Sequence, residues 1–222
     1  PLPPAHDAAA ADDAEAGDDA EAGGDAAAEH DDLDAEPDGE PTVFELRDED
    51  LTPLIVGAAR KIKRVLADEQ NEVLDALRRS DPVRNLDALV PWSSHHGERY
   101  TEAIADDLRT AAEAGARITT GASLRAAATR DVVERASASL VTSLVEPLRE
   151  RLARSVADGD GDNAVITKTV RAVYRETKTR HIDEQLDDVF RTAHGRGVLA
   201  SVGPDEPIVW TPDPEAGCCS DC

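Results

Sequence analysis

Apolar residues recur at steps of three and four residues over long stretches of this chain, which is the spacing of one face of an α-helix. The first stretch follows Thr52-Pro53, a threonine N-cap with proline at the first helical position, and runs to about Ser80-Asp81-Pro82. Its apolar side consists of Ile55, Ala58, Ile62, Val65, Leu66, Val73, Leu74 and Leu77. Its opposite side consists of Arg60, Lys61, Lys63, Arg64, Asp68, Glu69 and Glu72. This pattern predicts one long amphipathic helix.

Three further helices are predicted after a loop at residues 83–97. They cover residues 98–114, with a break at Gly115, then 123–156, and finally 163–195. Pro147 lies inside the second of these and predicts a kink near Val145, while Gly195-Arg196-Gly197 fits a C-cap for the last. Aromatic residues make up only 3% of the chain, so any core is built from Ala, Leu, Val and Ile. The predicted fold class is mainly α, with long amphipathic helices in an elongated bundle.

The start of the chain has a different composition. Residues 1–42 hold fifteen Asp or Glu residues and no Lys or Arg, a net charge of −15. Such a segment cannot bury enough apolar surface to offset its ordering entropy, and it is predicted to be disordered. The sequence therefore divides into an acidic tail over residues 1–48, an α-helical domain over 49–200 and a short cysteine-bearing module over 201–222.

The overall charge and the lengths of the apolar runs exclude two classes of partner. The net charge of −23 argues against nucleic-acid binding, because phosphates are neutralised by a basic protein face. No apolar run reaches the roughly 18 residues of a membrane span. We therefore expect protein partners rather than DNA, RNA or a membrane.

The three cysteines, Cys218, Cys219 and Cys222, all lie among the last five residues, after a predicted short strand at Ile208-Val209-Trp210. Two thiolates at the spacing of Cys219 and Cys222 can bind one zinc ion, and Cys218 could replace Cys219 as a ligand. Because tetrahedral zinc needs four ligands, we expect the others beyond residue 222, in a chain that begins with proline and contains no methionine. A redox dithiol and three unliganded cysteines are the alternatives that the spacing leaves open.

Two loops contain residue types that are found in functional sites. Asp158-Gly159-Asp160-Gly161-Asp162 places acids at alternate positions, as a calcium loop does, but lacks the glycine and the glutamate that complete such a loop. We expect a turn in which Asp162 or Asn163 caps the next helix. The run Ser93-Ser94-His95-His96 combines a nucleophile type with a base type, but no nucleophile elbow surrounds the serines. It predicts an exposed loop.

The remaining titratable residues favour structural roles. His194 lies in the last turn of the final predicted helix, where a partial positive charge suits the helix dipole. His181 lies on the same helix. The acid pairs Asp68-Glu69, Asp106-Asp107 and Asp187-Asp188 are expected on solvated helix faces.

Residues 166–222 resemble the C-terminal module of phage head morphogenesis proteins, the Mu-type minor head family. The elements that carry the resemblance are the helix from Val170 to Glu176 and onward to Gly195-Arg196-Gly197, the dipeptide Val209-Trp210, Asp213, and Cys219-Ser220-Asp221-Cys222. The resemblance implies a further His and Cys downstream, and with them a knob held by zinc or by disulfides.

The resemblance also implies a function. We expect a phage or prophage virion assembly protein that binds capsid or portal subunits, or itself through its helices, and that performs no chemistry. It would act in the host cytoplasm or in the virion, with zinc as its one candidate cofactor. The alternatives are a host coiled-coil adaptor with a structural zinc knuckle, and an enzyme that uses Cys219 and Cys222 with the His95-His96 loop. A closed four-ligand zinc site would favour structure, whereas an open coordination position would favour catalysis.

Overall fold

The computed structural model describes residues 40–79, 82–121, 123–203 and 205–209. Nearly all of the acidic tail and the three cysteines lie outside these residues. The described residues belong to one of two compact units, which begins at Glu40.

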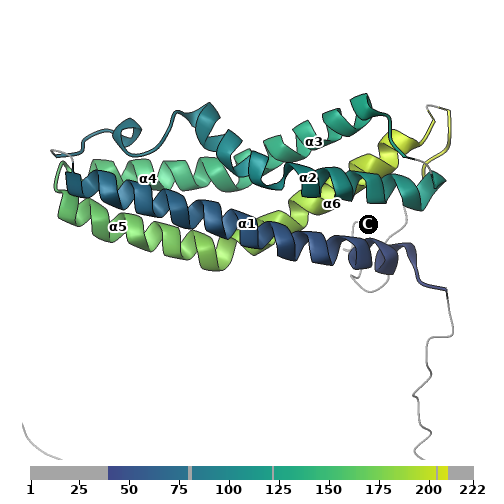
Figure 1. The fold of residues 1–222 in the computed structure, drawn as a ribbon, viewed down its shortest axis with the longest axis horizontal. Helices are drawn as coiled ribbons and strands as arrows, with labels where there is room; N and C mark the ends of the chain where they lie inside the picture. Colours follow the sequence, from purple (N-terminus) through teal and green to yellow (C-terminus); the bar gives the residue numbers. More distant parts are fainter. Residues whose placement is uncertain (1–39, 80–81, 122, 204, 210–222) are drawn as a thin grey trace, which may run out of the picture. The chain divides into compact units, whose positions relative to one another are not determined.

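Four long helical runs make up this unit, so the prediction of a mainly α fold with long packed helices is confirmed (Figure 1). The first two runs are α1 (Val43–Arg79) and α2 (Ser93–Thr120), with a short 3₁₀ turn, η1 (Leu86–Ala88), between them. The third run joins α3 (Ala126–Leu140) to α4 (Glu146–Gly159) through the π-turn η2 (Val141–Val145). The fourth joins α5 (Asn163–Glu176) to α6 (Ile182–Ser201) through the π-turn η3 (Thr177–His181). Figure 1 shows these runs passing back and forth beside one another.

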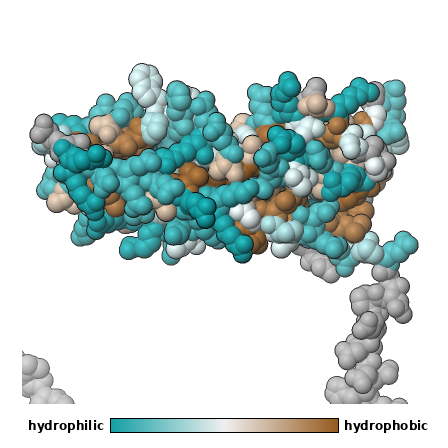
Figure 2. Space-filling view, viewed as in Figure 1, coloured by the Kyte–Doolittle hydropathy of each residue, from teal (hydrophilic) through white to brown (hydrophobic). Residues whose placement is uncertain are grey.

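The core is formed by one apolar stripe from each helix. In α1 the fully buried positions include Ile62, Leu66, Val73 and Leu77, which recur at helical spacing. Large core residues from the other runs include Ile104, Leu108, Leu140, Leu148, Leu152, Ile166, Leu186 and Phe190. Figure 2 shows hydrophilic side chains over most of the visible face, with apolar side chains along the seams and near the start of α1. Among the described residues, no helix combines the length and the apolar character needed to cross a membrane.

Helices α2 and α6 come into close contact at two glycines, Gly115 of α2 and Gly197 of α6. A Cβ atom built on Gly115 would lie 2.1 Å from the carbonyl oxygen of His194, and one on Gly197 would lie 2.0 Å from that of Ala112. No side chain fits in either place. These glycines let the two backbones come into contact, with buried Ala111, Ala112, Ala114 and Ala116 of α2 filling the same layer.

Several helix boundaries differ from the sequence prediction. Helix α1 begins at Val43 rather than at Pro53, because Thr42 and Glu45 form a capping box: the Thr42 backbone N–H donates to Glu45 Oε2 at 2.6 Å, and the Glu45 N–H donates to Thr42 Oγ1 at 3.2 Å. Residues 43–48, which were assigned to the acidic tail, are therefore helical.

The glycines explain the other boundary errors. Helix α2 continues through Gly115 and ends at Gly121, whose φ of +66° is the left-handed conformation of a C-cap. Helix α6 likewise continues through Gly195-Arg196-Gly197 to Ser201, so the predicted C-cap is wrong. Among the described residues the only glycines with positive φ are Gly121 and Gly161, so Gly115 and Gly197 serve close packing instead of helix termination.

Two local predictions are confirmed. The π-turn at Val141–Val145 lies where Pro147 was expected to disturb the helix, since proline lacks an N–H and its ring clashes with the carbonyl of Ser143. Asp162 caps α5, accepting from the N–H groups of Ala164 at 2.8 Å and Val165 at 3.2 Å. The predicted strand at residues 208–210 is not seen in the described part. Ile208 and Val209 are exposed and have no regular structure, and Trp210 lies outside the described residues.

Candidate functional site

Four polar side chains from three helices meet inside the bundle: Glu69 of α1, His96 and Tyr100 of α2, and Tyr174 of α5. The Glu69 carboxylate lies 2.8 Å from His96 Nε2 through Oε2, and it accepts the Tyr174 hydroxyl at 2.8 Å through Oε1. The rings of His96 and Tyr100 meet edge to face with centroids 5.6 Å apart. We call these four residues the buried cluster.

The backbone places each member of the buried cluster on a core stripe. Glu69 occupies the position between Leu66 and Val73 on the buried face of α1. His96 and Tyr100 lie one turn apart on α2, on the stripe that continues with Ile104. Relative exposures are 1% for Glu69, 0% for His96 and Tyr100, and 1% for Tyr174.

This arrangement corrects two sequence predictions. Glu69 was expected on a solvated face, and it is buried. His96 was expected in an exposed loop, but α2 begins at Ser93, so that His96 is helical and faces the core while His95 faces solvent. Two signals could have found the cluster: Glu69 continues the series Ile62, Leu66, Val73 at core spacing, and His96, Tyr100, Ile104 and Leu108 are four residues apart.

The electrostatics of the cluster keep both tyrosine hydroxyls protonated. Burial, followed by the negative charge of Glu69, raises the pKa of Tyr174 well above its usual range, and the same causes in the same order raise the pKa of Tyr100. Among the described residues, His96 Nδ1 and the Tyr100 hydroxyl have no hydrogen-bond partner. At the surface next to the cluster, Arg99 and Glu72 form a two-pronged ion pair with distances of 2.6 and 2.8 Å.

A carboxylate, an imidazole and two phenols are residue types of acid–base catalysis, but catalysis requires that a substrate reach them. Here all four side chains are enclosed by apolar core residues. What the cluster does in this state is to join α1, α2 and α5 through directed hydrogen bonds at one level of the bundle.

His194 is a second buried titratable group. It lies inside α6, not in its last turn, and its Nε2 atom has no partner among the described residues. Burial is the main cause that lowers its pKa, and the positive charge of Arg47 acts in the same direction. The expected role of His194 as a charged helix cap is therefore wrong.

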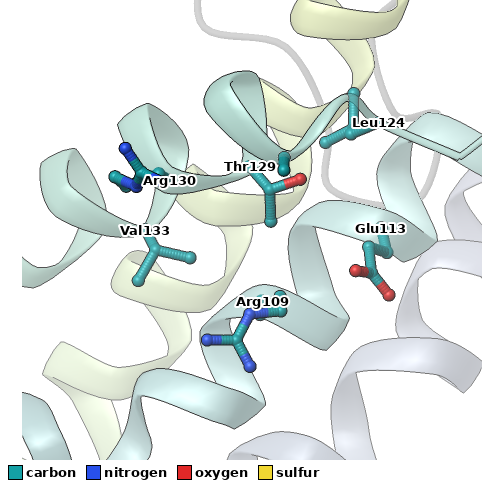
Figure 3. Close-up of a pocket in the computed structure, with 7 residues that line it drawn as sticks. Arg109, Glu113, Leu124, Thr129, Arg130 and Val133 are labelled. Carbon is teal, nitrogen blue, oxygen red and sulfur yellow. The ribbon is translucent and has the colours of Figure 1, made fainter.

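A surface groove of about 420 Å³ lies between α2 and α3. Figure 3 shows Arg109 and Glu113 rising from α2 on one side, and Thr129 and Val133 projecting from α3 on the other. The remaining lining residues are Leu124, Ala126 and Arg130. Arg109 pairs with Asp106 on its own helix, and the Thr129 hydroxyl donates to the Arg125 carbonyl oxygen at 3.2 Å. The groove thus has no nucleophile that is activated by a base.

The predicted metal ligands Cys218, Cys219 and Cys222 lie outside the described residues. Within the part of the chain that the structure describes, no group of three or more His, Cys, Asp or Glu side chains is placed to hold a metal ion. His181 lies 3.7 Å from Glu176 at the surface.

Comparisons with protein-family models, with curated protein sequences and with solved structures give no match.

Proposed function

We propose that this protein takes part in the assembly of a phage or prophage virion, as a protein of the minor head type, and that it acts by binding other proteins. Two lines of support lead to this function. One is the resemblance of residues 166–222 to the head morphogenesis module. The other is the organisation of the helical unit.

The observation that carries the proposal is the burial of the acid–base cluster. The one place where the described side chains combine a carboxylate, an imidazole and phenols is closed to solvent, with exposures of 0% or 1%. A partner can reach the charged outer faces of the helices and Trp92, which is exposed at the N-cap of α2. Exposed aromatic residues are typical anchors in protein interfaces.

The partners that fit this proposal are capsid or portal subunits, or a second copy of the chain. The protein would act in the host cytoplasm and in the virion. Cys219 and Cys222, or Cys218 in place of Cys219, would supply thiolates to a structural zinc ion.

Co-sedimentation tests the proposal. The protein is expressed together with portal and capsid subunits encoded by the same genome, and assembled heads are separated on a gradient. We expect the protein to sediment with the heads or with portal rings. The fraction that co-sediments should fall more in the Trp92→Ala variant than in the Trp92→Phe variant. Heads that form normally and never carry the protein would refute an assembly role.

The metal is tested separately by elemental analysis of the purified protein. One zinc per chain, lost in the double variant Cys219→Ser with Cys222→Ser, is expected. A zinc content that is unaffected by both substitutions would rule out this site.

A further inference from the structure

Helix α5 and the following π-turn carry a cationic stripe, which we define as Lys168, Arg171, Arg175 and Lys178. Successive members are three, four and three residues apart, so they share one helix face about 15 Å long. All four are exposed. The opposite face of the same segment holds the core residues Ile166, Val170, Val173, Tyr174 and Thr177.

The stripe is unusual for this chain, whose net charge is −23. Residues 163–181 contain five Lys or Arg residues and a single acid, Glu176. Composition alone would place acids on this face. Their absence makes the stripe a positive surface on an otherwise acidic protein.

Several exposed arginines on other helices pair with an acid of the same helix within one turn. Arg78 pairs with Asp75, Arg109 with Asp106, Arg135 with Asp131, and Arg191 with Asp187. Within the described residues, no carboxylate lies at ion-pair distance from any member of the cationic stripe. Its members are instead each other's neighbours at i+3 and i+4, an arrangement of like charges that destabilises a helix. The stripe therefore weakens its own helix, which points to a use outside the fold.

A hollow of about 320 Å³ lies beside the stripe, at the π-turn. It is lined by Ala172, Arg175, Glu176, Thr179 and Arg180. Glu176 is already engaged, since it pairs with Arg151 of α4 and lies 3.7 Å from His181. Arg175 and Arg180 leave the hollow suited to a carboxylate from another molecule.

We propose that the cationic stripe is a docking surface for an acidic segment of a partner protein. The proposal rests on the proposed function in taking the partner to be a protein. Charge complementarity gives the chemistry of the partner: carboxylates spaced by three and four residues on one helix would match the four cations over the same length. A nucleic acid is disfavoured because a long polyanion would extend beyond the stripe onto the acidic remainder of the protein, whereas a short acidic segment can contact the stripe alone.

The test uses the full chain and a labelled, helical 20-residue peptide with Glu at positions three and four residues apart. Binding is followed by fluorescence anisotropy at low and at moderate salt. We expect an affinity that falls as salt is added. In the triple variant Lys168→Glu, Arg171→Glu, Arg175→Glu the affinity should be at least tenfold lower. A peptide with Gln in place of Glu should not bind.

A matched variant with the same change of net charge is Arg60→Glu, Arg125→Glu, Arg130→Glu, whose three exposed cations lie on α1, just before α3 and on α3. It should bind the peptide within about threefold of the original chain. Circular dichroism checks that both variants remain helical, and the corresponding Gln variants repeat the test if charge reversal prevents folding.

Three results would overturn the proposal: equal loss in both variants, no binding of the acidic peptide at all, or preferential binding of a 20-base-pair DNA duplex through the same residues. No virion protein is present in this assay. A failure here therefore leaves the co-sedimentation test of the assembly role unaffected, and a failure there leaves this result standing.

Discussion

The hydroxyl of Tyr174 should stabilise the fold when Glu69 is present and destabilise it when Glu69 is replaced. In the native chain this hydroxyl donates to a buried carboxylate at 2.8 Å. A hydrogen bond to a charged group contributes about 1.5–3 kcal/mol, so Tyr174→Phe should lower the free energy of unfolding by about 2 kcal/mol. In a Glu69→Leu background the same hydroxyl is buried without an acceptor, which costs about 1–3 kcal/mol. Tyr174→Phe should therefore raise the stability of that variant.

Urea unfolding, followed by far-UV circular dichroism, measures all four members of this double-mutant cycle. For a chain of this size each kcal/mol corresponds to about 2–4 °C in the midpoint of thermal unfolding. Tyr100→Phe is the comparison in the native chain, because the Tyr100 hydroxyl meets no hydrogen-bond partner in good geometry among the described residues, and its removal should cost less stability than Tyr174→Phe. Equal effects of Tyr174→Phe in both backgrounds, within about 0.5 kcal/mol, would refute the hydrogen bonding described for the cluster.

Three further predictions concern packing, pH and capping. Gly197→Ala should lower the free energy of unfolding by about 1–3 kcal/mol, because its Cβ would lie 2.0 Å from the carbonyl oxygen of Ala112. Gly195→Ala has open space around it and should raise the free energy of unfolding by up to about 1 kcal/mol. Urea unfolding that ranks the two variants the other way would contradict the close contact of α2 and α6. Because burial lowers the pKa of His194 in the folded state, the unfolded chain binds more protons below about pH 6.5, so the free energy of unfolding should fall as pH drops from there towards the folded-state pKa. His194→Gln should flatten this dependence of the unfolding free energy on pH, and the exposed His95→Gln should leave it unchanged. An unchanged pH dependence in His194→Gln would show that His194 is not its cause. Asp162→Ala removes the cap of α5 and should cost about 1 kcal/mol in the same urea assay, against no loss for the exposed Asp158→Ala.

The sequence was sufficient for the helices because their apolar residues have a period that only a helix satisfies. Ile62, Leu66 and Leu77 were assigned to the core of α1 from spacing alone, and all three are buried. The turn capped by Asp162 was predicted for the same kind of reason, since a run of Asp and Gly favours a turn with an Asx cap whatever surrounds it.

The glycines could not be assigned from local rules. Gly115 and Gly197 have the local signature of helix ends, yet both lie inside helices. Each is glycine because the backbone of the opposing helix occupies the place that a Cβ atom would take. That requirement depends on how α2 and α6 pack, which no window of sequence contains. Gly121, a true C-cap, has the same local character and differs in its positive φ and in the open space around it.

The buried cluster was missed for a related reason. The charge of Glu69 predicts a solvated position beside Asp68 and Glu72, whereas its place in the helical repeat falls on the apolar stripe. Its burial becomes possible only when Tyr174, more than a hundred residues away, supplies a hydrogen bond. A buried carboxylate is stable when its partners are present, and those partners are known only once the helices are packed.

The central proposal is that the protein acts through contacts on its outer faces, while the buried cluster holds the helices together. Its most direct test is the affinity of the doubly substituted Glu69→Leu, Tyr174→Phe chain for the portal or capsid partner, measured once unfolding curves have shown the chain to be folded. The account predicts an affinity within about twofold of the original. A folded variant that no longer binds, or that has lost a catalytic turnover which the original chain performs, would contradict it.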